Sequence, residues 1–149
     1  MTIRPATAAD REAVVAMAIR YYNTTPYARL LLVDRPRAEA GFDQVLAGGV
    51  VLVAESSEPK MLVGFHALLV GEHVLSRDRY AATLAQWVEP RFRTGVLATA
   101  LLRAAEEWTR RDGGVFVTVA APAAMPALAR FYGACGYVGI ETLLMKRVA

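Results

Sequence analysis

A basic stretch in the second half of the sequence, residues 91–98, contains the residues whose chemistry is easiest to infer. It reads Arg-Phe-Arg-Thr-Gly-Val-Leu-Ala, and apolar residues recur at helical spacing from residue 96 to residue 112. The predicted helix begins without a side-chain cap, so several backbone N–H groups at its start are left free, and the helix dipole adds partial positive charge there. Because Arg91 and Arg93 lie beside them, these N–H groups predict an anion-binding site.

The composition is that expected of one globular domain over residues 1–149. A chain of this length, of which 55% is hydrophobic, can bury about 70% of the surface that its unfolded form exposes. The sequence has no uninterrupted run of about 18 apolar residues, and it carries Arg4, Asp10 and Arg11 where a signal peptide would be apolar. We therefore expect a soluble, cytoplasmic protein that does not enter the membrane.

Charge and cysteine usage argue against further classes of function. The formal net charge is +3 and no basic run reaches about five residues, so nucleic acid is not an expected partner. The single cysteine, Cys135, excludes an internal disulfide framework and a zinc site built from cysteines, and no metal site is expected. A small side chain buried in the core is the favoured interpretation of Cys135, ahead of a reactive thiol.

Alternating and helical patterns predict an α/β chain. Thr7 followed by Asp10 has the spacing of a capping box ahead of the first helix, and Pro36 together with two glycines brackets the second. The predicted helices are residues 8–20, a segment between Asp34 and Gly48, residues 96–112 and residues 126–134. The predicted strands are residues 2–4, 50–55, 61–70, 80–88, 115–120, 137–140 and 143–148.

Three local features of the sequence carry further expectations. Gly64 interrupts the strand predicted at residues 61–70, which indicates a bulge or a close approach by another group. The strand predicted at residues 115–120 is almost unbroken in its apolar character, which is typical of a strand covered on both faces. Three tyrosines between the first two helices either pack in the core or form a wall of a substrate site. They are Tyr21, Tyr22 and Tyr27.

The order of these elements, β-α-α-β-β-β-α-β-α-β, resembles that of the GNAT superfamily of acyl-CoA-dependent N-acyltransferases. Residues 88–114, VEPRFRTGVLATALLRAAEEWTRRDGG, resemble the family's acetyl-CoA pyrophosphate motif and its helix. Residues 127–137, ALARFYGACGY, resemble its terminal element A-x-x-x-Y-x-x-x-G-[FY]. The resemblance implies a single-domain, mixed and mostly antiparallel sheet of six to seven strands, flanked by about four helices and splayed between its fourth and fifth strands.

The resemblance also implies a binding site for acetyl-CoA as cosubstrate. The family pattern of the basic turn, Q/R-x-x-G-x-G/A, corresponds to residues 93–98, where Arg93 and Ala98 match and Val96 replaces a glycine. Small residues in this pattern let backbone N–H groups approach the pyrophosphate, and Gly95 supplies some of that freedom. A backbone N–H near Trp87 or Val88, at the end of the fourth strand, would polarise the thioester carbonyl. The implied cofactor-binding residues are Trp87, Val88, Arg93, Thr94, Gly95, Val96, Leu97 and Ala98.

Tyr132 matches the family's tyrosine near the CoA sulfur, where it would serve as general acid toward the departing thiolate. A phenol has a pKa near 10 and a thiol a pKa near 8.5, so full proton transfer from Tyr132 to the thiolate is uphill by about 2 kcal/mol. A hydrogen bond from the phenol to the sulfur does not require that transfer. Many relatives carry a glutamate on the fourth strand, but Thr83 or Gln86 stands in that neighbourhood here. The candidates for the general base are Glu72, His66, His73 and a water held by Thr83. A base is dispensable if the amine arrives neutral.

The resemblance implies direct transfer of an acetyl group from acetyl-CoA to a primary amine in a ternary complex. The acceptor, a small molecule or a peptide amine, is not specified by any motif. Val96, the absent strand glutamate and Met125, which stands where many relatives have an asparagine, leave a second interpretation open. In it the chain is a degenerate member that binds acyl-CoA, or regulates, without turnover. A homodimer through the apolar C-terminal strands is a further implication of the resemblance.

Overall fold

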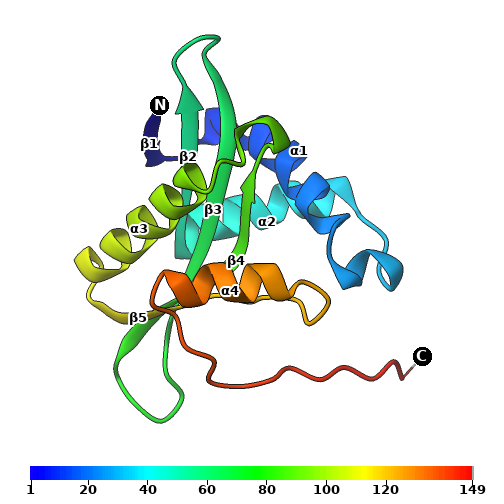
Figure 1. Cartoon of the computed structure of the whole chain (residues 1–149), viewed down its shortest axis with the longest axis vertical. Coiled ribbons are helices and arrows are strands. Elements are labelled where there is room, and N and C mark those ends of the chain that lie inside the picture. The colour runs from blue at the N-terminus through cyan, green and yellow to red at the C-terminus, as the bar shows by residue number, and fades with distance from the viewer. Residues whose placement is uncertain (149) are drawn as a thin grey trace.

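One twisted sheet, whose strands lie side by side in chain order, forms the centre of the molecule (Figure 1). The structure is a computed structural model that describes residues 1–148, so residue 149 of the predicted domain lies outside the described residues. Neighbouring strands are antiparallel except β4 and β5, which are parallel. The strands are β1 (Thr2–Pro5), β2 (Gly49–Ser56), β3 (Met61–Glu72), β4 (Arg79–Val88) and β5 (Gly114–Thr118).

Helices cover both faces of this sheet. They are α1 (Arg11–Tyr22), α2 (Arg35–Gly48), α3 (Val96–Arg111) and α4 (Pro126–Ala134), with short 3-10 turns at Ala8–Asp10, Pro26–Arg29 and Pro90–Phe92. Alternate side chains of β2 separate into two clusters: Val51 and Val53 pack with α1 and α2, whereas Leu52 and Ala54 pack with α3. No helix of the described chain combines the length and the apolar character needed to cross a bilayer.

Local signals in the sequence account for several of these bounds. The predicted capping box is present, because the Thr7 backbone N–H donates to Asp10 Oδ2 at 2.8 Å. Asp34 Oδ1 accepts from the backbone N–H of Arg37 at 2.7 Å and caps the start of α2. The prediction for Gly64 is confirmed: the β2–β3 register shifts beside it, and a Cβ there would lie 2.8 Å from the carbonyl oxygen of Trp87.

The splay expected between the fourth and fifth strands is present. The ladder that joins β4 to β5 covers only residues 79–82 of β4 and residues 114–118 of β5. Beyond it β4 continues to Val88 without a strand neighbour on that side in the described chain. The two strands therefore share a short base and then separate, which leaves one edge of β4 open.

Two predictions about the end of the chain are wrong. Residues 137–140 and 143–148 do not form strands, so the described sheet has five strands instead of six or seven. β5 closes the sheet instead of lying inside it, and Val115 and Phe116 are 62% and 42% exposed where a covered strand was expected. Apolar composition favours an extended chain, but a strand forms only when a neighbour supplies its backbone hydrogen bonds.

Candidate active site

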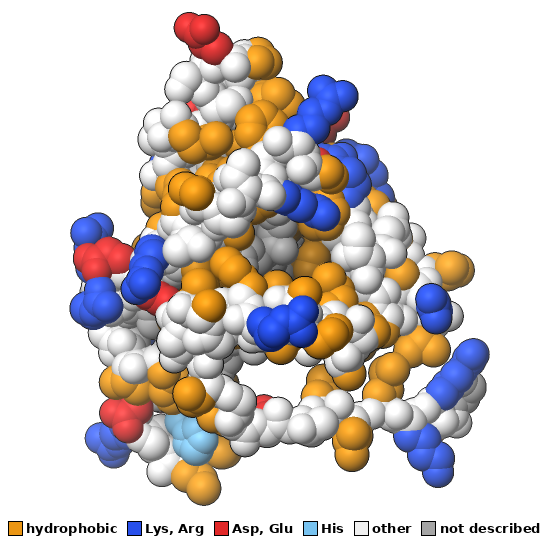
Figure 2. Space-filling model, viewed as in Figure 1, with side chains coloured by type: hydrophobic (Ala, Val, Ile, Leu, Met, Phe, Trp, Pro, Cys, Tyr) orange, Lys and Arg blue, Asp and Glu red, His pale blue; other side chains and the backbone are white. Residues whose placement is uncertain are grey.

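A cavity of about 350 Å³ occupies the gap between the separated strands. Its walls come from β4, the start of α3, the helix α4 and the end of α1. Figure 2 shows a hollow at the centre of this face of the molecule, with hydrophobic side chains around it. Of the residues implied by the sequence, those that line the cavity are Trp87, Val88, Arg93, Gly95, Ala98 and Tyr132. Thr94, Val96 and Leu97 belong to the same turn and helix start but are not among the lining residues.

The N-terminus of α3 is free of any side-chain cap. Gly95 precedes the helix with φ of 80°, a conformation that favours glycine, and a Cβ added there would meet nothing within 4 Å. Thr99 donates the first intrahelical hydrogen bond, to Gly95 O at 3.0 Å, so the N–H groups of residues 96–98 have no helical acceptor. Val96 is 76% exposed. The residue whose backbone conformation requires glycine is therefore Gly95. The glycine of the family pattern corresponds to the next residue, Val96.

Arg93 is held against the end of β4. Its Nε donates to the carbonyl oxygen of Val88 at 2.8 Å, and its guanidinium carbon lies 4.2 Å from the centre of the Trp87 ring. These two contacts orient the side chain toward the cavity, which it lines. Arg91, the other arginine of the predicted anion site, is exposed and does not line the cavity. Arg93 is the single charged residue among the described residues that do.

The backbone of β4 presents an unpaired N–H to the gap. Glu89 N donates to Val63 O on β3 at 2.8 Å, and successive residues of an antiparallel strand point their N–H groups to opposite sides. The N–H and carbonyl of Val88 therefore face away from β3, toward the gap. The contact from Arg93 to that carbonyl agrees with this orientation. Sequence reasoning left Trp87 and Val88 as alternatives for this donor, and the alternation selects Val88.

Tyr132 reaches the cavity from α4 and is tied to β4 through Gln86. Its hydroxyl donates to Gln86 Oε1 at 3.3 Å, and Gln86 Nε2 donates to Ala98 O in the first turn of α3 at 2.8 Å. Burial, with Tyr21 and Cys135 adding smaller effects, raises the pKa of Tyr132 to about 12. The phenol therefore keeps its proton throughout the physiological range. One amide side chain connects the three elements that enclose the cavity.

His66 lies behind the cavity wall and touches it through a threonine. His66 is fully buried on β3, and its Nε2 lies 2.8 Å from Thr83 Oγ1, whose residue lines the cavity. Burial lowers the pKa of His66 to about 4, so the imidazole is neutral at pH 7. The other two candidate bases, Glu72 and His73, come at the far end of β3 and do not line the cavity.

A bulge in β4 brings Thr83 and Gln86 onto one face. Gln86 pairs with His66 and Ala85 with Ala67, but Thr83 then pairs with Leu68, so residue 84 is extra. In a strand without a bulge, side chains three positions apart point to opposite faces. Sequence reasoning named both residues only as replacements for a missing glutamate. No local signal marks the bulge, so their joint placement could not be predicted.

Other predicted residues are distributed between the core, the cavity and the surface. Tyr21 and Met125 line the cavity, whereas Tyr22 donates to the carbonyl oxygen of Leu31 at 2.9 Å and Tyr27 is 42% exposed. Cys135 is half-buried and lies at a different groove, so its prediction as a buried core residue is wrong. Lining residues that the sequence did not reveal include Thr24, Thr25, Leu84, Ala120, Leu128 and Phe131. The described residues contain no cluster of three or more side chains of the kind that ligates metals.

The sequence matches that of the acetyltransferase (GNAT) family over residues 15–137. The chain therefore belongs to the GNAT acetyltransferase family, which uses acetyl-CoA as cosubstrate. No protein of curated function matches the chain in sequence.

Solved structures share the fold over nearly the whole length of both chains. A structure described as a probable acetyltransferase has a TM-score of 0.81 at 18% identity, covering 100% of this chain and 97% of its own. Glucosamine-6-phosphate N-acetyltransferase from Arabidopsis thaliana has a TM-score of 0.75 at 16% identity, covering 99% and 98%. An aminoglycoside acetyltransferase from an uncultured soil metagenomic sample, in complex with sisomicin, has a TM-score of 0.74 at 16% identity, covering 99% and 95%. At these identities the likeness concerns the fold.

Proposed function

We propose that this protein is an N-acetyltransferase that transfers the acetyl group of acetyl-CoA directly to an amine in a ternary complex. One observation carries the proposal: a single cavity adjoins the uncapped start of α3, the unpaired N–H of Val88 and the hydroxyl of Tyr132. These are a donor set for phosphate, a donor for a carbonyl oxygen and a donor for a leaving sulfur.

The start of α3 would hold the pyrophosphate of acetyl-CoA. The free N–H groups of residues 96–98 and the helix dipole attract an anion, and the left-handed Gly95 leaves the approach open. Arg93 adds a guanidinium whose Nε is already bonded to the strand, so its remaining N–H groups can face a phosphate without large reorganisation. Val96 is directed to solvent, which is compatible with phosphate bound at the backbone.

Val88 and Tyr132 would act on the reacting atoms. The Val88 N–H would donate to the thioester oxygen as negative charge develops on it. The Tyr132 hydroxyl donates to the sulfur as the carbon–sulfur bond breaks. With a pKa of about 12 against about 8.5 for a thiol, complete transfer of its proton would cost about 5 kcal/mol. Tyr132 therefore stabilises the thiolate by a hydrogen bond and keeps its proton.

The acceptor would enter as the neutral amine. His66, with a pKa of about 4, is too weak a base to remove a proton from an ammonium ion, and no carboxylate lines the cavity in the described chain. Thr83, fixed by His66, offers its hydroxyl oxygen as an acceptor for one amine N–H and so orients the nitrogen lone pair toward the carbonyl. The proton lost after attack leaves to solvent.

The lining of the cavity favours an acceptor amine carried on an apolar group. Leu84, Leu128, Phe131 and Tyr21 supply aliphatic and aromatic surface, and the one charged side chain is the cation Arg93. A polycationic acceptor would meet no carboxylate here. We therefore place 2-phenylethylamine ahead of spermidine, glucosamine 6-phosphate and sisomicin as an acceptor.

Two measurements test this proposal. First, acetyl-CoA at millimolar concentration should raise the melting temperature, and Arg93→Glu should abolish the shift while Arg91→Glu, a matched surface control, keeps it. Second, thiol release from acetyl-CoA should depend on added 2-phenylethylamine, with slower release for the three polar amines. No thermal shift at all would refute the assignment of the cosubstrate. A shift without thiol release on any amine would identify a binding or regulatory module instead of an enzyme.

A further inference from the structure

The amide side chain of Gln86 joins two elements that the proposed reaction uses for different purposes. Gln86 is half-buried on β4 and lines the cavity. Its Nε2 donates to Ala98 O at 2.8 Å, in the first turn of α3, and its Oε1 accepts from the Tyr132 hydroxyl at 3.3 Å. The start of α3 is the proposed phosphate site, and Tyr132 is the proposed donor to the sulfur. Gln86 therefore contacts the two groups on whose spacing the proposed reaction depends.

The carbonyl of Ala98 decides which way this amide faces. A carbonyl oxygen accepts hydrogen bonds and cannot donate, so the nitrogen of Gln86 must face Ala98 and its oxygen must face Tyr132. An amide oxygen only accepts, so the phenol is the donor in its contact with Gln86. A hydroxyl has one proton and makes one well-aligned donor bond at a time. Gln86 and the sulfur of acetyl-CoA would therefore compete for the same donor.

The geometry of the contact between Gln86 and Tyr132 favours an exchange of acceptors. O–H···O hydrogen bonds are usually about 2.5–3.0 Å long, so a contact of 3.3 Å is a weak one. It directs the hydroxyl toward the cavity without holding it strongly. Rotation about the C–O bond of the phenol is enough to change its acceptor. Burial raises the pKa of Tyr132 to about 12, which keeps the proton on the phenol during that rotation.

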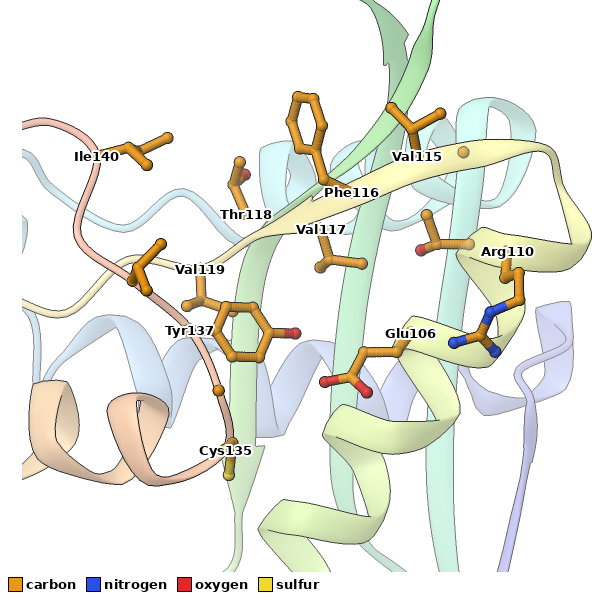
Figure 3. Close-up of a pocket in the computed structure, with 14 residues that line it drawn as sticks. Glu106, Arg110, Val115, Phe116, Val117, Thr118, Val119, Cys135, Tyr137 and Ile140 are labelled. Atoms are coloured by element: carbon orange, nitrogen blue, oxygen red, sulfur yellow. The ribbon is translucent and has the colours of Figure 1, made fainter.

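The ring of Tyr132 is held by contacts that do not involve Gln86. Its centroid lies 5.5 Å from that of Phe131 and 5.9 Å from that of Tyr137. Tyr137 lines a second hollow, of about 700 Å³, which lies beside the outer edge of β5 and shares no lining residue with the cavity. Tyr137 points toward Glu106 of α3 there (Figure 3), so it supplies Tyr132 with a ring contact. Loss of Gln86 should leave the Tyr132 ring in place and free only the direction of its hydroxyl.

We propose that Gln86 is a positioning residue, which directs the Tyr132 hydroxyl into the cavity and gives up this hydrogen bond to the sulfur when acetyl-CoA lies against the start of α3. This role rests on the proposed function. Because the same amide is anchored at Ala98, one side chain fixes the separation between the phosphate site and the donor to the sulfur. The two ends of one cosubstrate then meet groups whose spacing is set before it binds.

The substitution Gln86→Glu separates this role from that of a general base. If position 86 needs a base, a carboxylate there should raise activity. The positioning role predicts the opposite, because a carboxylate cannot donate to the carbonyl of Ala98 and, as a charged acceptor, holds the Tyr132 hydroxyl more strongly than an amide oxygen does. When the carboxyl group is protonated, its O–H can donate to Ala98 and its carbonyl can accept from Tyr132, as the amide does.

The pH dependence of kcat distinguishes the two roles. Titratable or charged groups around position 86 are His66 on the paired strand β3, Tyr21 of α1, Tyr132 of α4, Cys135 after α4, and Arg93. Burial lowers the pKa of His66 to about 4, so His66 stays neutral above about pH 5.5. Dividing kcat of Gln86→Glu by kcat of the parent chain, at each pH between about 5.5 and 8, removes the titration of the amine from the comparison.

The positioning role predicts that this ratio is below unity and rises as the pH falls toward the pKa of the introduced carboxyl group, which partial burial raises above about 4.3. A ratio that rises with pH would identify a general base. A ratio that does not depend on pH would identify a loss of packing. Either of these two outcomes would overturn the proposal.

A double-mutant cycle tests whether Gln86 acts through Tyr132. Gln86→Leu should lower kcat by about five- to tenfold and change the KM for acetyl-CoA by less than about threefold. In a Tyr132→Phe background the same exchange should change kcat by less than about twofold, because the hydroxyl that Gln86 directs is absent. Gln44→Leu and Gln44→Glu make the same exchanges at an exposed residue of α2 outside the cavity, and should leave kcat unchanged. Equal losses from Gln86→Leu in both backgrounds would overturn the proposal.

Nuclear magnetic resonance of isotopically labelled tyrosine Cζ atoms tests the proposal without turnover. The chain has six tyrosines, and Tyr132→Phe identifies the signal of Tyr132. Gln86→Leu should shift this signal, because the hydroxyl loses its acceptor, and acetyl-CoA added to the parent chain should shift it whether or not an amine reacts. A signal that is the same in the parent chain and in Gln86→Leu would overturn this proposal while leaving thiol release, and so the proposed function, untouched. A signal that responds to Gln86→Leu but not to acetyl-CoA would refute the exchange of acceptors.

Discussion

The β4 edge that faces the splay and the outer edge of β5 are both without a strand neighbour in the described chain, yet they are lined by different chemistry. At β4 the side chains of Gln86 and Thr83 are held by hydrogen bonds, and α4 covers the opening. At β5 the edge carries exposed Val115 and Phe116, with Tyr137 on the opposite side of the hollow that they line. The β4 edge, whose polar side chains are held in place and covered by α4, suits a small ligand. The apolar outer edge of β5, whose backbone groups have no strand partner in the described chain, suits another extended segment.

The largest expected effect concerns His66, which is paired with Thr83 behind the β4 edge. His66 has a folded-state pKa of about 4 against 6.5 in the unfolded chain, so the unfolded state binds the extra proton between these values. The free energy of unfolding should therefore fall by about 3 kcal/mol as the pH drops from 6.5 to 4. Urea unfolding at several pH values measures this loss, and His66→Gln should remove most of it in that window.

Below pH 4 the same unfolding experiment contains an internal control, the carboxylate of Asp10. Asp10, hydrogen-bonded to Arg4, has a pKa lowered to about 2, so its contribution is lost as the pH falls from about 3.8 to about 2. This loss should persist in His66→Gln. Equal acid sensitivity of the parent and His66→Gln between pH 6.5 and 4 would show that His66 is protonated without cost, and that the β4 edge is less rigid than its hydrogen bonds indicate.

The anion site at the cavity is expected to give an effect of similar size. Arg93→Glu replaces an oriented guanidinium by a carboxylate and should weaken acetyl-CoA binding by about 100-fold, which corresponds to about 3 kcal/mol. Titration calorimetry measures the affinity. Arg91→Glu makes the same charge change at an exposed side chain outside the cavity, and should change the affinity by less than about fivefold. Similar losses in both variants would mean that net charge, not a built site, attracts the cosubstrate.

The two tyrosines whose rings lie 5.9 Å apart sharpen the comparison between the two edges. Tyr132→Phe removes the donor expected at the sulfur and should lower kcat by about 10- to 30-fold, with the affinity for acetyl-CoA little changed. Tyr137→Phe removes a hydroxyl that lies outside the cavity, at the hollow beside the outer edge of β5, and should leave kcat within about twofold. Steady-state kinetics at saturating acetyl-CoA checks both values. A larger effect at Tyr137 would show that the outer edge of β5 is coupled to the chemistry in the cavity.

The smallest expected effect concerns the departure from the family pattern. Because Val96 is 76% exposed and Gly95 supplies the left-handed backbone, Val96→Gly should change the affinity for acetyl-CoA by less than about threefold. Gly95→Val, the matched exchange one position earlier, forces a β-branched residue to φ of 80° and should weaken binding more. An improvement of tenfold or more in Val96→Gly would show that the valine does narrow the phosphate site.

The sequence by itself determined the elements whose signals are local. The capping box at Thr7, the cap at Asp34, the basic turn before α3 and the bounds of α4 could all be predicted, because each depends on groups a few residues apart. Tyr132 and Arg93 could be assigned to one site because they lie in motifs with a known spatial order. The sequence also predicted strands at residues 137–140 and 143–148, and that prediction was wrong, because apolar composition does not supply a strand neighbour.

Only the tertiary structure decided which groups meet at each edge. The bulge at residue 84 turns Thr83 and Gln86 to the side of His66, and such a bulge depends on how two strands register along their whole length. The exposed β5 edge and the unpaired segment 143–148 are likewise consequences of pairing between distant residues. A strand's propensity is local, but its hydrogen-bond partners are not. The open edge of β4 was therefore expected only through the family resemblance, and the free outer edge of β5 was not predicted.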